Sequence, residues 1–238
     1  MLIDLHTHSL LSDGQLCPAE LVQRARKKGY RALAITDHVD SSNIDSVVSQ
    51  IVKFCRENAP LNSDIRVIPG VELTHLSPPL ISKLARKARG NGARLILVHG
   101  ETIVEPVPNH TNIAALRADI DILAHPGPIS EEEVRMAKER GIYLEISSRK
   151  GHSLTNGWLA RLATKWGAKL ILNTDAHGAE DLITEEMARK ILQGAGLSSP
   201  EIESATRNSQ ELVDKIILQE KSPNSKLKIK SKSSAHDG

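Results

Sequence analysis

Aromatic residues are almost missing from this chain, since only 2% of its 238 residues are Phe, Trp or Tyr. Apolar residues still make up 39% of the sequence, so a sizeable core must be built from Leu, Ile, Val and Ala. The two cysteines, Cys17 and Cys55, are too few for a disulfide framework. No apolar run approaches the length of a membrane span, and no basic-then-apolar leader precedes Asp4. These absences predict a soluble cytoplasmic protein without a membrane partner.

A strong charge of one sign is missing as well. The net charge is +2, but residues 221–238 hold five lysines and one aspartate, so the preceding 220 residues carry −2. This near-neutral body gives no sign of a broad nucleic-acid-binding face. The Lys/Ser-rich end predicts a disordered, solubilising tail at 221–238 after a single domain at 1–220. Nucleic acid is therefore not the favoured partner, and nothing in the sequence indicates an oligomeric state.

Short apolar runs alternate with longer amphipathic stretches along the chain. The runs predict strands at 2–5, 32–35, 65–73, 95–98, 120–124, 143–147 and 169–173. The stretches between and after them predict helices at 18–28, 44–57, 78–89, 111–118, 130–140, 154–166, 184–193 and 200–218. Ser130 and Glu133 have the spacing of a capping box, and Thr184 and Ser199 are expected helix caps. This alternation indicates a parallel sheet, either a barrel or an open doubly wound sheet.

The first strand leads directly into two histidines, His6 and His8. Alternate side chains of a strand share a face, so both imidazoles are expected to point the same way. Asp13 follows in the next loop and can fold back toward them. Two imidazoles and a carboxylate can begin a metal site. For a lone His-x-His pair, however, chance is the simpler explanation.

Residues of the same types recur at the ends of the other predicted strands. In a parallel α/β barrel these ends open onto one face, where active sites lie. Nine candidate metal ligands would then converge on one cavity, namely His6, His8, Asp13, His38, Glu72, His99, His125, Asp175 and His177. Each one alone is explained equally well as a capping or core residue, but the complete set favours a metal centre.

The ligand types restrict the metal. Imidazole and carboxylate without thiolate suit zinc, manganese or iron. Nine ligands exceed the needs of one ion, so two or three divalent ions are expected, with Glu72 as a candidate bridge. Clustered ions produce a metal-bound hydroxide at neutral pH and hold the oxygens of a phosphoryl group. We therefore expect Asp175, His177 and Glu72 to be catalytic as well as metal-binding.

Several motifs, in this order, resemble those of the PHP (polymerase and histidinol phosphatase) superfamily. They are His6-Thr-His8, Ser-Asp13-Gly, Thr-Asp-His38, Gly-Val-Glu72, Val-His99-Gly, Ala-His125-Pro-Gly and Thr-Asp175-Ala-His177. The resemblance spans about residues 1–215 and is strongest to small stand-alone members of the histidinol-phosphatase-like type. It implies a distorted (β/α)7 TIM-like barrel with a metal cluster at the C-terminal ends of the strands. It also implies three ions, held by His6, His8, Glu72 and Asp175; by Asp13, His38 and His177; and by Glu72, His99 and His125.

Two loops near the expected mouth carry further polar residues. Arg149, Lys150 and His152 follow the sixth strand, and their charge suits a substrate phosphate. A solvated loop is the alternative interpretation. Glu101 and Glu105 lie in a proline-containing loop, where they are candidates for a proton donor or for a hydrogen bond to a ligand histidine.

These observations predict a metal-dependent phosphoesterase, most simply a phosphomonoesterase. Histidinol phosphate, another small phosphorylated metabolite or a nucleotide are the candidate substrates. A nuclease acting on phosphodiester ends is the first alternative, although the few aromatics count against a single-strand channel. Carbon–nitrogen hydrolysis of the amidohydrolase type fits the motifs less well. A non-catalytic metal-binding scaffold is the last alternative, and the intact motifs argue against it.

Overall fold

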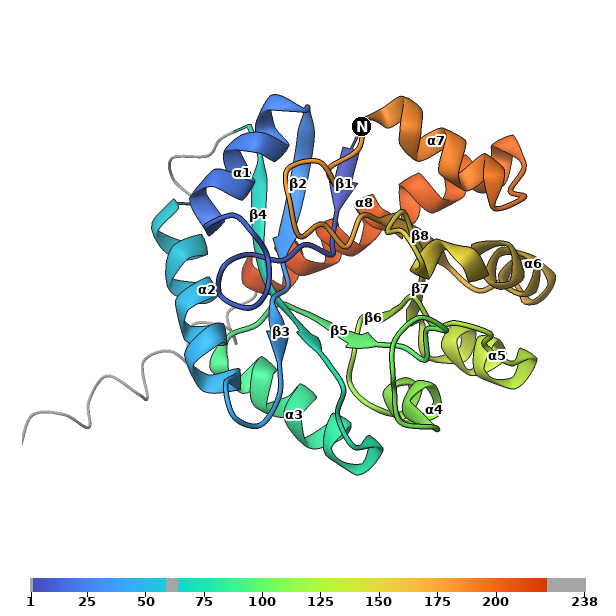
Figure 1. The fold of residues 1–238 in the computed structure, drawn as a ribbon, viewed down its shortest axis with the longest axis horizontal. Helices are drawn as coiled ribbons and strands as arrows, with labels where there is room; N and C mark the ends of the chain where they lie inside the picture. The colour runs from blue at the N-terminus through green and yellow to red at the C-terminus, as the bar shows by residue number, and fades with distance from the viewer. Residues whose placement is uncertain (1, 59–63, 222–238) are drawn as a thin grey trace, which may run out of the picture.

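The computed structural model describes residues 2–58 and 64–221. It is a nearly closed barrel of parallel strands surrounded by helices (Figure 1). The strands are β1 (Leu2–Asp4), β2 (Tyr30–Ile35), β3 (His38–Val39), β4 (Arg66–Leu73), β5 (Leu95–His99), β6 (Ile122–Ala124), β7 (Tyr143–Ser147) and β8 (Leu170–Asn173). They pair in the order β1-β2-β4-β5-β6-β7-β8, and β3 is a two-residue continuation of β2 that also pairs with β4. The expected distorted barrel of seven strands is confirmed, and the open sheet is excluded.

The helices occur where the amphipathic pattern predicts them. They are α1 (Pro18–Lys27), α2 (Ile44–Asn58), α3 (Pro78–Asn91), α4 (Thr111–Arg117), α5 (Glu131–Arg140), α6 (Asn156–Trp166), α7 (Glu185–Gly194) and α8 (Ser199–Lys221), with a 3₁₀ turn η2 (His152–Thr155) before α6. The capping box of Ser130 and Glu133 is present, and Thr184 accepts from the Met187 amide. The cap predicted at Ser199 is wrong by one residue. Ser199 is already helical, and Ser198 accepts the Ile202 amide on its backbone carbonyl.

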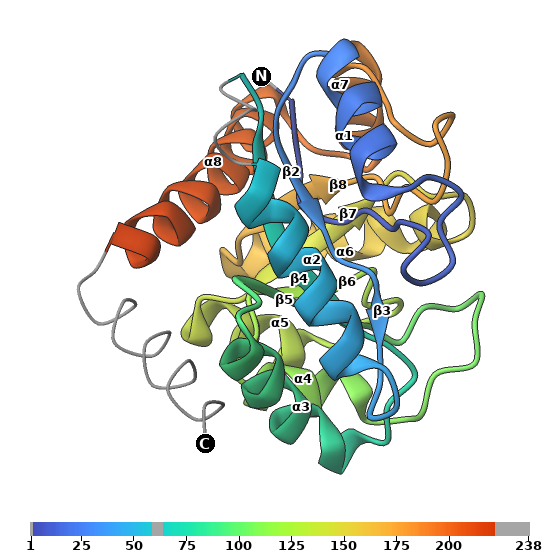
Figure 2. The same cartoon turned by 90° about the vertical axis from the view of Figure 1, so that its left-hand side faces the viewer.

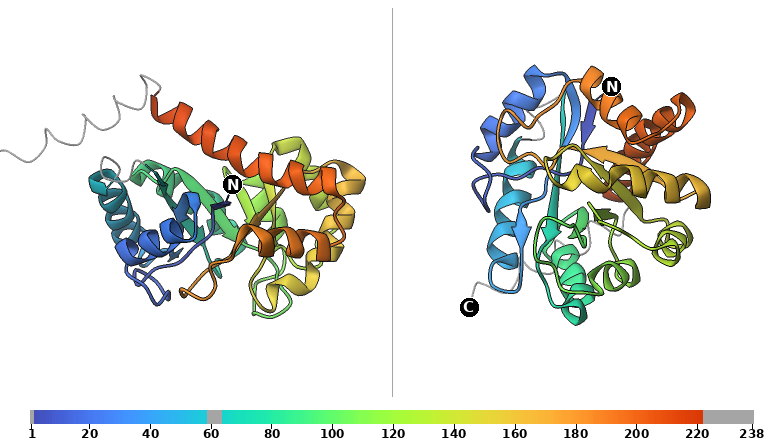
Figure 3. Two further views of the ribbon diagram at one scale, coloured as in Figure 1. Left: turned by 90° about the horizontal axis from the view of Figure 1, so that it is seen from above. Right: turned by 45° about the vertical axis from the view of Figure 1, so that its right-hand side comes forward.

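Helix α8 closes the N-terminal end of the barrel. It crosses that end from one side of the strands to the other, as Figures 2 and 3 show. Its buried residues Leu212, Val213 and Ile216 join the interior cluster that contains Ile68 and Leu95. A second apolar cluster fills the space between the strands and the outer helices. The barrel is therefore open only at the C-terminal ends of its strands.

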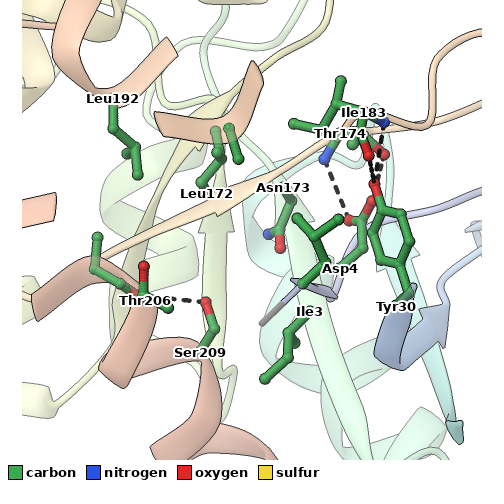
Figure 4. A pocket seen from close by; sticks show the side chains of 13 residues that line it. Ile3, Asp4, Tyr30, Leu172, Asn173, Thr174, Ile183, Leu192, Thr206 and Ser209 are labelled. Atoms are coloured by element: carbon green, nitrogen blue, oxygen red, sulfur yellow. Dashed lines mark hydrogen bonds between the residues drawn. The ribbon is translucent and has the colours of Figure 1, made fainter. Parts of the chain in front are cut away.

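The barrel wall is completed by side chains where β1 and β8 meet. The two strands share only an isolated bridge between Thr7 and Ala176 beyond their ends. The carboxylate of Asp4 accepts hydrogen bonds from the amide and the hydroxyl of Thr174, at 3.2 and 2.5 Å. A small cavity of about 50 Å³ lies beside this seam (Figure 4). Burial raises the pKa of Asp4 to about 6, against the hydrogen bonds from Thr174.

Among the described helices, none combines the length and the apolar character needed to cross a bilayer. The basic tail predicted from the sequence lies, from residue 222 on, outside the described residues.

Candidate metal centre

The structure brings all nine predicted metal ligands to the open end of the barrel. His6 and His8 follow β1, His125 follows β6, and Asp175 and His177 follow β8. Of the remaining ligands, Asp13 lies in a loop, and His38, Glu72 and His99 lie on β3, β4 and β5, respectively. Six of the nine are buried, and the partly or fully exposed ones are Asp13, His38 and His177. The sequence therefore predicted the gathering of these side chains correctly.

Glu72 and Asp175 lie at the centre of the group. The Nε2 atoms of His6 and His125 lie 3.4 and 3.3 Å from Glu72 Oε1. His6 Nε2 is also 3.6 Å from Asp175 Oδ1, and His8 Nε2 is 3.0 Å from the same oxygen. Two ligands on one tetrahedral zinc ion stand about 3.3 Å apart. Most of these separations are thus longer than good hydrogen bonds and match the spacing of ligands around a shared ion.

A second group lies nearer to solvent. Donor atoms of His8, Asp13, His38 and His177 all lie within 4.8 Å of one another. The Nε2 atoms of His177 and His38 are 3.2 and 3.5 Å from Asp13 Oδ2. The separations again match neighbouring ligands of one ion. This grouping includes every residue that the family resemblance assigns to the second ion.

A third group involves a residue that the sequence assigned to substrate. Donor atoms of His99, His125 and His152 lie within 4.8 Å of one another. The rings of His125 and His152 stack with centroids 4.0 Å apart. His152 is buried, and its Nε2 is 3.5 Å from Asp175 Oδ2. His152 is therefore close enough to the metal centre to bind either an ion or a substrate phosphate.

Several of these atoms are buried without a hydrogen bond. They are His6 Nε2, both ring nitrogens of His8, His125 Nδ1, Glu72 Oε1 and Asp175 Oδ1. A buried polar atom without a partner costs about 1–3 kcal/mol, so a concentration of such atoms at one place requires a compensating ligand. Divalent ions bound to imidazole nitrogens and carboxylate oxygens supply that compensation. The residues present therefore fit more than one metal ion.

The electrostatics favour cations at the same place. Burial alone would raise the pKa of Glu72, but the positive charge of His6 and His38 outweighs it and leaves the pKa well below the usual value. The pKa of Asp175 is lowered in the same way, chiefly by His6 against the effect of burial. Burial and the neighbouring His38 lower the pKa of His8 to about 3, so its imidazole is neutral. Ionised carboxylates and neutral imidazoles are the forms that bind metals, so an ion at His6 or His38 would displace a proton, because the neighbouring carboxylates raise the pKa of both histidines.

Glu145 is a site residue that the sequence analysis missed. It lies inside the barrel on β7, and its Oε2 accepts hydrogen bonds from His6 Nδ1 and Asn173 Nδ2, both at 2.8 Å. The bond orients the His6 ring so that Nε2 faces Glu72 and Asp175, and it would keep a proton on Nδ1 when Nε2 binds a metal ion. The available signal was a carboxylate in the middle of a buried strand, where a charge needs a partner.

Asp37 holds the loop that carries Asp13. Its carboxylate accepts from the amide and hydroxyl of Ser9, both at 2.7 Å, and from the hydroxyl of Ser12 at 2.7 Å. Asp37 therefore orients the segment that leads to the neighbouring candidate ligand Asp13.

Two of the candidate ligands, His125 and Asp175, have strained backbone conformations. The non-glycine residues with positive φ are His75 (51°), His110 (70°), His125 (26°) and Asp175 (52°) among the described residues. Such conformations cost free energy and persist where the surroundings enforce them, commonly at functional sites. Asp tolerates the left-handed region better than most residues, which suits Asp175 to its position.

A cavity of about 330 Å³ opens beside the cluster. Among its lining residues are Arg149 and His152, which were predicted to bind phosphate. Arg149 Nη1 donates to the Asp175 carbonyl at 3.0 Å and lies 2.8 Å from His177 Nδ1. Lys150 is exposed and is not among the lining residues. Several candidate ligands and the guanidinium group of Arg149 thus line the same cavity.

The two acidic residues of the β5–α4 loop, Glu101 and Glu105, make different contacts. Glu101 Oε1 accepts from the Asn112 amide at 2.9 Å, at the start of α4, and so turns away from the cluster. Glu105 Oε2 lies 2.8 Å from His99 Nε2. That hydrogen bond lowers the pKa of Glu105 to about 2, so this carboxylate is ionised at neutral pH and does not donate a proton. Of the two roles predicted for Glu105, only the contact with a ligand histidine is supported.

Sequence comparisons give the same family as the motifs. The family model named PHP domain matches residues 4–102. An uncharacterized protein of Methanocaldococcus jannaschii is 49% identical over 205 residues, which cover 86% of this chain and 94% of that protein. A protein named probable phosphatase from Thermoanaerobacter sp. (strain X514) is 27% identical over 218 residues, covering 83% and 88%.

Solved structures share the fold. A chain of an archaeal ribonuclease P with mature tRNA superposes with a TM-score of 0.69 at 16% identity, covering 93% of this chain and 94% of that chain. The histidinol phosphate phosphatase of Lactococcus lactis superposes with a TM-score of 0.57 at 17% identity, covering 82% and 94%. At these identities the likeness shows the fold alone.

The fold and the site define the class first: an α/β barrel with a histidine–carboxylate centre suited to several metal ions at the C-terminal ends of its strands. The chain belongs to the PHP domain superfamily, as its motifs predicted. The alignments cover most of the length of the two relatives named above.

Proposed function

We propose that this protein is a metal-dependent phosphomonoesterase that acts on a small phosphorylated metabolite or nucleotide. The observation that carries the proposal is the set of buried, unpartnered ligand atoms, one of which belongs to Asp175 beside the guanidinium group of Arg149. Relatives of similar length are named probable phosphatases, which supports the same reaction class. The histidinol phosphate phosphatase with the same fold was solved with zinc, L-histidinol and phosphate, so zinc and histidinol phosphate are reasonable first choices for assay.

The nine ligand residues would hold two or three divalent ions of zinc, manganese or iron. When bound, such ions lower the pKa of a shared water and neutralise charge on phosphoryl oxygens. Glu72 and Asp175 lie between the histidine groups, so each is placed to join neighbouring ions. His177, next to Asp13 and Arg149, belongs to the metal centre and also lines the cavity.

Arg149 and His152 are the phosphate-binding residues in this proposal. The planar fork of a guanidinium group matches two oxygens of a phosphate, and the Asp175 carbonyl holds the Arg149 fork beside the cavity. Thr102 Oγ1 lies 2.7 Å from His152 Nδ1 and holds that ring with Nε2 toward the cluster. Lys150, which is exposed, contributes only long-range positive charge.

The first test is a panel of histidinol phosphate, nucleotides and sugar phosphates, assayed with manganese or zinc and again after chelation. We expect metal-dependent release of inorganic phosphate from at least one monoester. The variant Asp175→Asn, purified in the same way, controls for contaminating phosphatases. A folded, metal-loaded protein that releases phosphate from none of these monoesters would reject the proposal and favour the scaffold alternative.

A nuclease is the second candidate. It is favoured by a local match to the 5'-3' exoribonuclease of Haemophilus influenzae, 41% identical over 71 residues but covering only 30% of this chain and 23% of that protein. Metal-dependent release of mononucleotides from an oligonucleotide, without activity on the monoesters, would support it instead.

A further inference from the structure

Besides Glu145, a second carboxylate outside the nine predicted ligands reaches the metal centre. Glu105 lies in the loop between β5 and α4, and its two oxygens face three imidazoles. Oε2 is 2.8 Å from His99 Nε2 and 3.8 Å from His75 Nε2, and Oε1 is 3.5 Å from His152 Nε2. Donor atoms of His75, His99 and Glu105 all lie within 4.8 Å of one another.

The base of this loop is fixed. Glu101 and Asn112 exchange two hydrogen bonds, from the Glu101 amide to Asn112 Oδ1 and from the Asn112 amide to Glu101 Oε1. The Glu101 carbonyl packs so tightly on Gly127 that a Cβ there would lie 1.8 Å from it. The loop therefore leaves the barrel at a defined position.

The outer part of the same loop is held much less. Within the described residues, no backbone–backbone hydrogen bond involves residues 103–107. Ile103 and Val104 are 55% and 45% exposed, and in Figure 2 the green segment between β5 and α4 projects from the open end of the barrel. The Glu105 carboxylate is the polar group that ties this segment to the site.

His99 presents a single nitrogen to the cavity. Its Nδ1 lies 3.1 Å from the Gly100 carbonyl, so Nε2 is the atom available to a metal ion, and it is the atom that Glu105 contacts. Ligands of one tetrahedral ion stand about 3.3 Å apart, so a shared ion requires Glu105 to withdraw by about half an ångström. A half-exposed side chain on a loop can make that shift.

We propose that Glu105 is a tenth ligand of the metal centre, bound to the ion at His99, and that this bond fastens residues 103–107 across the mouth of the cavity. The inference rests on the metal centre proposed above. Fastening the loop would narrow access to the cavity, which also lies against His75 and Glu105, and would suit a small substrate better than a polymer.

The test compares the wild-type protein with Glu105→Gln and with the matched control Glu101→Gln. Gln at position 101 keeps an oxygen for the Asn112 amide, and the side chain it replaces does not face the cluster. Binding of zinc and manganese is measured by titration and by metal analysis after dialysis. Hydrogen exchange of residues 103–107 is measured with and without metal.

We expect Glu105→Gln to weaken binding of the most loosely held ion by at least about tenfold. Even residues that only hydrogen-bond to a metal ligand contribute that much to metal affinity. Metal should slow hydrogen exchange at 103–107 in the wild type and in Glu101→Gln, but not in Glu105→Gln. Equal metal affinity and equal metal-dependent protection in all three proteins would overturn this inference and leave the phosphatase proposal intact. A wild-type protein that binds no metal would reject both.

Discussion

The same strands carry apolar side chains at one end of the barrel interior and candidate metal ligands at the other. On β5 the inward positions are Leu95, Leu97 and then His99. On β8 and beyond, Ile171 is followed two residues later by Asn173 and then by Asp175. The period of two in a strand keeps the side chains within β5 and β8 on the inner face, and Asp175 follows two residues after the end of β8. On β5 and β8 the inward side chains thus begin in an apolar layer and lead to a candidate ligand, His99 or Asp175.

The apolar layer at the N-terminal ends of the strands (the lower layer) and the ligand layer at their C-terminal ends (the upper layer) have different roles. The lower layer is a cluster of buried apolar side chains that includes Leu212, Val213 and Ile216 of α8. The upper layer contains buried nitrogen and oxygen atoms without hydrogen bonds, which lower the stability of the fold. We infer that the lower layer stabilises a barrel whose upper layer is arranged for metal binding, so substitutions in the two layers should have separable effects.

The largest effect is expected from Asp175→Asn in the upper layer. Asn tolerates the positive φ of this position, so the fold should persist while the carboxylate charge beside His8 is lost. We expect kcat/KM for the best monoester to fall at least about 10³-fold, about 4 kcal/mol in transition-state stabilisation. Asp119→Asn, at an exposed aspartate before β6, is the control and should leave kcat/KM unchanged. Wild-type activity in Asp175→Asn would remove this residue from the reaction.

The next effect concerns the lower layer. Leu212→Ala removes a fully buried side chain of α8 and leaves a cavity against the interior of the barrel, so the free energy of unfolding should fall by about 2–5 kcal/mol. Leu218→Ala, at a 68% exposed position of the same helix, should change it by less than about 0.5 kcal/mol. Urea denaturation measures both. Metal content per folded chain should be normal in both variants, and a specific loss of metal in Leu212→Ala would mean that the layers are not separable.

A smaller effect is expected from Glu145→Gln, between the two layers. The amide keeps the shape of the side chain but loses the charge that orients His6 through Nδ1. Loss of such a partner typically weakens metal binding about 10- to 100-fold. Glu139→Gln, at an exposed position on α5, serves as the control. Metal titrations that give the same affinity for Glu145→Gln and the wild type would show that His6 needs no charged partner.

The sequence predicted the upper layer well because ligand-type residues follow predictable strands. Once the ends of β5 and β6 are known, His99 and His125 must meet, since parallel strands end on one face. The sequence did not show Glu145, because a single acidic residue within a strand does not indicate which side chain it contacts. Neither could it show that Glu105 turns inward while Glu101 turns toward α4, because that depends on loop geometry.

The most direct test of the central claim is the number of metal ions per chain in the purified protein. The nine ligand residues, with Glu72 and Asp175 at their centre, predict at least two tightly held divalent ions in the wild type, and fewer in Asp175→Asn. Metal analysis after extensive dialysis gives this number without any assumption about the substrate. A well-folded protein that retains less than one ion per chain would contradict the account of a multi-metal hydrolytic centre.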